Sequence, residues 1–109
     1  MKEDNTFICN KIRIGENAAD NDKLISESKQ SDLWFHLENV SSCHVVLSTS
    51  KEYPATKQMI NHCAYLTKSN TKYKNLLKIA VNYTKIKNVR KTDILGMVKI
   101  KGKTMTVLI

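Results

Sequence analysis

The sequence predicts a single α+β domain with a mostly antiparallel sheet of about five to six strands, one short helix and one long helix. The chain has 109 residues, the size of one ordinary domain. It contains one proline and three glycines, so no linker divides it. Segments of period-two alternation stand on both sides of one long helical stretch, an order that is neither strict strand–helix alternation nor all-β. We therefore expect one domain over residues 1–109.

A strand and a short helix are predicted first. Residues 7–14 alternate loosely between apolar and basic side chains, and Gly15 ends this strand. Asn17 and Asn21 each carry a side-chain oxygen that can cap a helix. A weak apolar stripe then extends this helix to about Lys29.

A hairpin is predicted next. Its strands cover residues 32–37 and 44–47, where apolar and aromatic side chains predominate. The connecting loop contains Asn39, Ser41 and Ser42, residue types that favour turns. Two antiparallel strands joined by this loop are the simplest arrangement.

The long helix is predicted after Pro54, whose fixed φ suits a first helical turn. Met59, Cys63 and Leu66 recur there at spacings of four and three, which places them on one face.

Three strands are predicted after this helix. Residues 77–84 alternate strictly, as in a half-buried strand. Shorter strands follow around residues 97–100 and 104–109.

Positive charge is concentrated in the last third of the chain. Residues 1–67 carry 7 Lys+Arg and 9 Asp+Glu, a net charge of −2. Residues 68–109 carry 11 Lys+Arg and one acid, Asp93, a net charge of +10, which gives the total of +8. Such asymmetry indicates a polyanionic partner, either nucleic acid or an anionic membrane surface. The alternative is a solvated lysine-rich surface that keeps the protein soluble.

The sequence also limits the compartment and the cofactors. No apolar run approaches the roughly 20 residues of a membrane span, so we expect no integral membrane contact. The polar, charged N-terminus lacks the layout of a secretory signal. Cys9, Cys43 and Cys63 are odd in number and widely spaced, which fits neither a disulfide framework nor a zinc site. We expect reduced cysteines, a cytoplasmic protein, and neither a metal nor a cofactor.

The first predicted hairpin carries the most distinctive side chains. Strand alternation places Asp32, Trp34 and His36 on one face and apolar residues on the other, and His44 begins the partner strand. These four side chains are expected to converge. Trp34 is either a stacking platform for an unpaired base or a core residue. The two histidines either contact phosphates and base edges or are structural, and their spacing matches no established metal motif.

A basic segment follows the strand at residues 77–84. Lys85, Lys87, Arg90 and Lys91, with Asn88 among them, are expected in a tight loop that suits phosphate contacts. No nucleophile motif and no glycine-rich phosphate loop occurs, so we assign no catalytic residues.

Several segments together resemble the NFACT-R domain, the RNA-binding domain of ribosome-associated quality-control factors. The resemblance covers roughly residues 11–109, and DLWFH at Asp32–His36, followed by His44, is its most specific part. Glu16 departs from the family's usual basic residue, and Ser42 from its frequent glycine. The further matching stretches are IGENAADND (14–22), SSCHVVL (41–47), VNYT (81–84), KNVRK (87–91) and GMV (96–98).

This resemblance implies an intracellular RNA-binding domain in translation or ribosome rescue, without a settled catalytic activity. Its RNA would be tRNA or rRNA, with the ribosome as a further partner, and Asn17 within IGENAADND joins the RNA-binding candidates. Two alternatives remain open. One is an RNA-acting enzyme that uses Asp32, His36 and His44. The other is an adaptor that docks on a protein or an anionic membrane through the basic segment.

Overall fold

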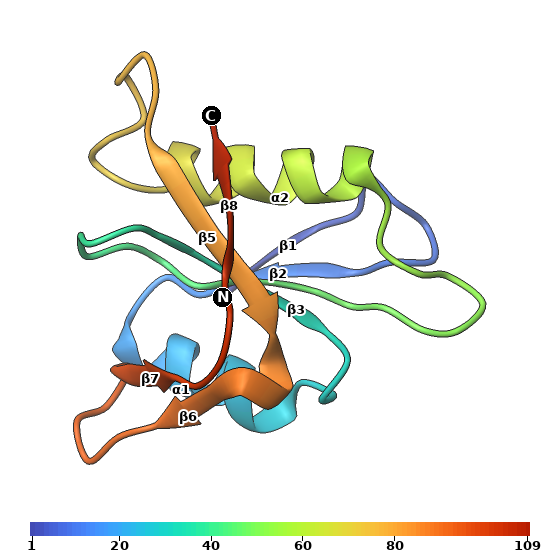
Figure 1. Cartoon of the computed structure of the whole chain (residues 1–109), viewed down its shortest axis with the longest axis horizontal. Coiled ribbons are helices and arrows are strands. Elements are labelled where there is room, and N and C mark those ends of the chain that lie inside the picture. Colours follow the sequence, from blue (N-terminus) through green and yellow to red (C-terminus); the bar gives the residue numbers. More distant parts are fainter.

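A six-stranded antiparallel sheet forms the middle of three layers in this computed structural model, which describes residues 1–109 (Figure 1). The spatial order of its strands is β1-β2-β4-β3-β5-β8, and every neighbouring pair is antiparallel. The predicted α+β class with its antiparallel sheet is therefore confirmed. The strands are β1 (Lys2–Asp4), β2 (Ile12–Ile14), β3 (Leu33–Leu37), β4 (Val45–Leu47), β5 (Ala80–Lys85) and β8 (Met105–Leu108).

Helix α2 (Lys57–Ser69) covers one face of the sheet (Figure 1). The predicted helical stripe is confirmed, because Cys63 is fully buried in the main core and Met59 and Leu66 pack against it. Phe35 and Leu37, on the apolar face of β3, contribute to the same core. The other buried members are Ile12, Ile14, Val45, Leu47, Ala64 and Val81.

The other face of the sheet is covered by helix α1 (Ala18–Glu27) and a small two-stranded sheet (Figure 1). That sheet consists of β6 (Val89–Lys91) and β7 (Val98–Ile100), and the 3₁₀ turn η1 (Ile86–Asn88) joins it to β5. A second core forms between these layers. It contains Leu24, Trp34, Val46, Ile86 and Val89.

The N-terminal elements differ in part from the prediction. The strand expected over residues 7–14 is limited to β2, and β1 was not expected at all. Strand β1 is short, charged and at the sheet edge, so it carries no alternating apolar signal. Asn17 caps α1 as expected, because its side-chain oxygen accepts a hydrogen bond from the Asp20 amide at 2.8 Å.

Two later boundaries also differ. The long helix begins at Lys57 after the capping residue Thr56, so Pro54 lies ahead of its first turn. Strand β5 begins at Ala80 and not at residue 77. Pairing with the C-terminal segment continues only one residue further, where Ile79 and Ile109 exchange two backbone hydrogen bonds of 3.0 Å, so residues 77 and 78 have no strand opposite them. Neither helix is long and apolar enough to span a membrane.

Candidate nucleic-acid interface

Three aromatic side chains, two from β3 and one from the residue before β4, meet beneath the small sheet. The ring centroids of Trp34 and His36 lie 5.4 Å apart with nearly parallel planes, at 10°. His44 stands almost perpendicular to both, at 5.3 Å from each ring. We call Trp34, His36 and His44 the aromatic cluster. The sequence placed these three together correctly through the antiparallel pairing of β3 and β4.

The segment Ile14–Asp22 positions His44, which immediately precedes β4. The buried side chain of Asn21 in α1 accepts a hydrogen bond from the His44 amide at 3.3 Å. The carbonyl of His44 accepts a second bond from Gly15 at 2.9 Å. A Cβ atom at Gly15 would overlap the Asn21 side-chain oxygen, so the glycine permits this close approach. Asn21 is a site residue that the sequence suggested only as a helix cap.

Burial keeps both histidines of the cluster neutral at pH 7. Burial, with a smaller contribution from the neighbouring His36, lowers the pKa of His44 to about 3. Burial also lowers the pKa of His36, although a hydrogen bond to the Leu37 carbonyl opposes this shift. Because that carbonyl accepts, Nδ1 of His36 carries the proton and Nε2 is an acceptor.

Trp34 is a core residue and not an open stacking platform. It is only 3% exposed and packs in the second core, which decides between the two alternatives for its environment. The alternation of β3 was predicted correctly, but the face that carries Trp34 is covered by α1, η1 and β6 instead of facing solvent.

Asp32 does not join the aromatic cluster. Its two carboxylate oxygens accept hydrogen bonds from the amides of Lys29 (2.9 Å) and Thr49 (3.0 Å). It also lines a different surface depression from the cluster. The expected four-residue convergence is therefore a three-residue one, and the Asp32–histidine arrangement of the enzymatic hypothesis is not formed. The chain contains no group of three or more His, Cys, Asp and Glu residues suited to a metal ion.

The predicted basic segment is only partly a loop. Lys85 ends β5, Lys87 lies in η1, and Arg90 lies in β6, so the expected tight loop is a 3₁₀ turn that continues as a strand. The change arises because Val89 and Ile86 are drawn into the second core. All three basic side chains are exposed and make no ion pair.

Three other candidates are engaged within the protein. Lys91 forms an ion pair with Asp22 at 3.0 Å and also contacts Ser26 of α1. Asn88 donates to the Thr84 hydroxyl at 2.9 Å. The Asn17 side-chain oxygen caps α1. Nothing in these contacts places the three residues at a ligand.

Three lysines that were not proposed as site residues extend the exposed basic region. Lys99 of β7 lies directly opposite Arg90 of β6. The Lys101 amide donates to the Asn88 carbonyl at the end of η1, and the Lys103 carbonyl accepts from the Thr84 hydroxyl near the end of β5. None of them forms an ion pair. We call the set the basic surface: Lys85, Lys87, Arg90, Lys99, Lys101 and Lys103.

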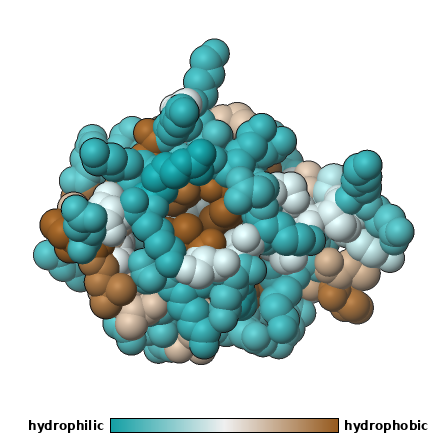
Figure 2. Space-filling view, turned by 90° about the horizontal axis from the view of Figure 1, so that it is seen from below, coloured by the Kyte–Doolittle hydropathy of each residue, from teal (hydrophilic) through white to brown (hydrophobic).

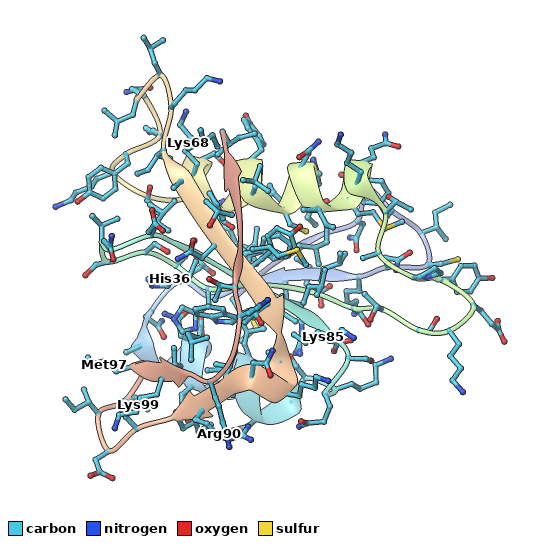
Figure 3. All side chains as sticks on the ribbon, viewed as in Figure 1. His36, Lys68, Lys85, Arg90, Met97 and Lys99 are labelled. Carbon is cyan, nitrogen blue, oxygen red and sulfur yellow. The ribbon has the colours of Figure 1, made fainter.

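The remaining C-terminal lysines lie elsewhere. Lys68 is in the last turn of α2, on the side of the sheet away from Arg90 and Lys99 (Figure 3). The polycationic third of the sequence is thus divided between two regions. On the side of α1, β6 and β7, hydrophilic residues surround a hollow in which apolar surface is visible (Figure 2).

Comparisons with known proteins agree with this arrangement. Residues 3–107 match the family model described as the NFACT protein RNA binding domain. The chain is 32% identical to mouse coiled-coil domain-containing protein 25 over 87 residues, which cover 74% of this chain and 41% of that protein. It is 30% identical to the Rqc2 homolog RqcH of Bacillus subtilis over 83 residues, 75% of this chain and 14% of that protein.

A solved structure shares the fold. The C-terminal part of the fibronectin/fibrinogen-binding protein from Streptococcus suis superimposes with a TM-score of 0.77 at 25% identity, over 90% of this chain and 40% of that one. The chain thus spans less than half the length of these relatives. The match over almost all of its residues shows that the chain belongs to the family of NFACT RNA-binding domains.

Proposed function

We propose that this chain is an RNA-binding module for tRNA or rRNA, and that the basic surface contacts the phosphates. The observation that carries the proposal is the direct pairing of Arg90 with Lys99 across β6 and β7, with both side chains exposed and neither in an ion pair. Two like charges opposite each other on a sheet destabilise it. A bound polyanion would remove this repulsion, and the release of its counterions would favour binding.

The family supports RNA as the polyanion, and the relative RqcH supports a setting in translation or ribosome rescue. We extend the proposal to the ribosome as a partner and to the cytoplasm as the compartment, where three free cysteines remain reduced. The activities of the much longer relatives are not transferred to this domain.

Fluorescence anisotropy at several salt concentrations tests the proposal. The protein is titrated into labelled tRNA, single-stranded RNA and duplex DNA, first as wild type and then as the double variant Arg90→Ala/Lys99→Ala. Neutralising two phosphate contacts should lower the log–log salt slope for single-stranded RNA by about 1.4.

The double variant Lys51→Ala/Lys57→Ala is the matched control. It removes the same charge from exposed positions remote from β6 and β7. Its slope should equal that of the wild type. A wild-type slope near zero, or equal losses in both double variants, would contradict the proposal. If the protein then co-sediments with anionic vesicles and does not bind RNA, the adaptor alternative is favoured.

A further inference from the structure

A cavity of about 450 Å³ opens beside the aromatic cluster. Trp34 and His36 of β3 form one wall, and the connection that leads to His44 forms another. The third wall is β7 and the residues that precede it, where Gly96 turns the chain with a φ of 79° that favours glycine.

The cavity wall carries no formal charge. None of the lining residues is Lys, Arg, Asp or Glu, and burial lowers the pKa of both histidines so that they are neutral at pH 7. A phosphate or carboxylate inside would lose its hydration without an ionic partner, which is unfavourable. A neutral, planar and polar group suits this wall.

Two polar nitrogen atoms in the wall are buried without a hydrogen-bond partner. They are Nε1 of Trp34 and Nδ1 of His44, in side chains that are 3% and 2% exposed. A buried donor or acceptor without a partner costs free energy, and such atoms are rare in native proteins. Trp34 Nε1 is only a donor, so a ligand group that pairs with it must be an acceptor.

The stacking within the cluster determines how a ligand can approach. Trp34 lies parallel to His36 and has no face open to solvent, so a planar ligand cannot stack on it. The hydrogen-bonding group of the ring is Nε1 at its edge, which lies buried behind the cavity lining. A ligand must therefore present its own hydrogen-bonding edge to Trp34 and His44.

Positive charge stands immediately outside this neutral wall. Exposed Lys99 lies between the lining residues Val98 and Ile100, and exposed Lys103 precedes Thr104. Because the two nitrogens are buried, a ligand would reach them only if lining segments such as Met97 or the connection at residues 39–43 moved aside. Both segments lie outside the strands of the main sheet, which therefore stays intact during entry. Met97 immediately precedes β7, on the same side of the sheet as Lys99 (Figure 3).

We propose that this cavity binds one unstacked nucleobase by its hydrogen-bonding edge, while the phosphates of the same RNA lie on the basic surface. Trp34 Nε1 donates to a ring nitrogen or carbonyl oxygen of the base, and His44 Nδ1 pairs with the adjacent group. This inference rests on the proposed RNA-binding function and adds to it a site for a single base.

The only tryptophan of the chain makes the test direct. In a ¹H–¹⁵N spectrum Trp34 gives the single indole N–H peak. The protein is titrated with each of the four ribonucleoside monophosphates and, as the control without a base, with ribose 5-phosphate. The His44→Phe variant, which keeps a ring of similar size but has no Nδ1, is titrated in the same way.

At least one nucleotide should move the indole peak downfield to saturation, with an affinity about tenfold above that of ribose 5-phosphate. His44→Phe should lose this difference. An indole peak that no nucleotide moves would overturn the base site, and the wild-type titration decides this even if the variant does not fold. Salt-dependent RNA binding in the anisotropy experiment would then leave the proposed function standing. A saturating indole shift, together with no salt-dependent RNA binding in the anisotropy experiment, would support the base site and contradict the proposed function.

Discussion

Replacing His44 should remove a specific pH dependence of stability. His44 is 2% exposed, and burial lowers its pKa from 6.5 to about 3. The only titratable side chain that faces it in the cavity wall is His36, whose pKa is also lowered. No carboxylate is available there to stabilise an imidazolium. The folded protein therefore holds His44 neutral, whereas the unfolded chain protonates it below pH 6.5.

The sign and size of the effect follow from this difference. Because the folded-state pKa is the lower one, the unfolded state binds more protons as the pH falls, and stability is lost. The contribution is nearly complete above pH 7 and decreases through the window between 6.5 and about 3. Between pH 7.5 and pH 5.0, a shift of this size removes about 2 kcal/mol of the free energy of unfolding.

Urea denaturation of the wild type and His44→Phe at pH 7.5, 6.0 and 5.0, followed by circular dichroism, measures this contribution. The free energy of unfolding of the wild type minus that of the variant should fall by about 2 kcal/mol over this range. Carboxylates elsewhere titrate equally in both proteins and cancel in the difference. A difference that stays constant within about 0.5 kcal/mol would refute the buried, neutral state of His44.

Three further substitutions test the positioning of the cluster and the core, each by thermal or urea denaturation. Gly15→Ala should destabilise the protein by about 1 to 3 kcal/mol, because the new methyl group overlaps the Asn21 side chain; unchanged stability would contradict that close approach. Asn17→Ala should lower the free energy of unfolding by about 1 kcal/mol, because the hydrogen bond from the Asp20 amide is lost. Asn17→Asp should retain most of this stabilisation, because aspartate also caps helices. Phe35→Ala, at a fully buried position in the main core, should lower the free energy of unfolding by about 3 to 5 kcal/mol. A smaller loss would mean that neighbouring side chains move into the space left by the phenylalanine ring.

Local patterns predicted much of the fold. The alternation over residues 32–37 and the spacing of Met59, Cys63 and Leu66 identified β3 and the buried side of α2. These signals work because each element has one apolar face in the main core. The covering of the second face of β3 could not be predicted in this way, since it depends on Ile86 and Val89, which lie about 50 residues further along the chain.

The candidate site was predictable to the extent that strand pairing determines it. Pairing of β3 with β4 brings His36 and His44 together, and the alternation identified Trp34 as their neighbour. Asp32 was misplaced because its partners are backbone amides of other segments, which no residue pattern reveals. Lys99 lies opposite Arg90 only because of the register between β6 and β7. The sequence alone therefore included its charge in the total but could not show where it lies.

Photo-crosslinking with single-stranded RNA that contains 4-thiouridine, followed by mass spectrometry of the linked peptides, tests the central claim most directly. It distinguishes the basic surface from the second group of lysines around the end of α2, Lys68, Lys72, Lys74 and Lys78. We predict links to peptides within residues 85–103 that disappear at high salt. Links confined to residues 68–78, or no salt-sensitive links at all, would contradict the assignment of the RNA-binding face.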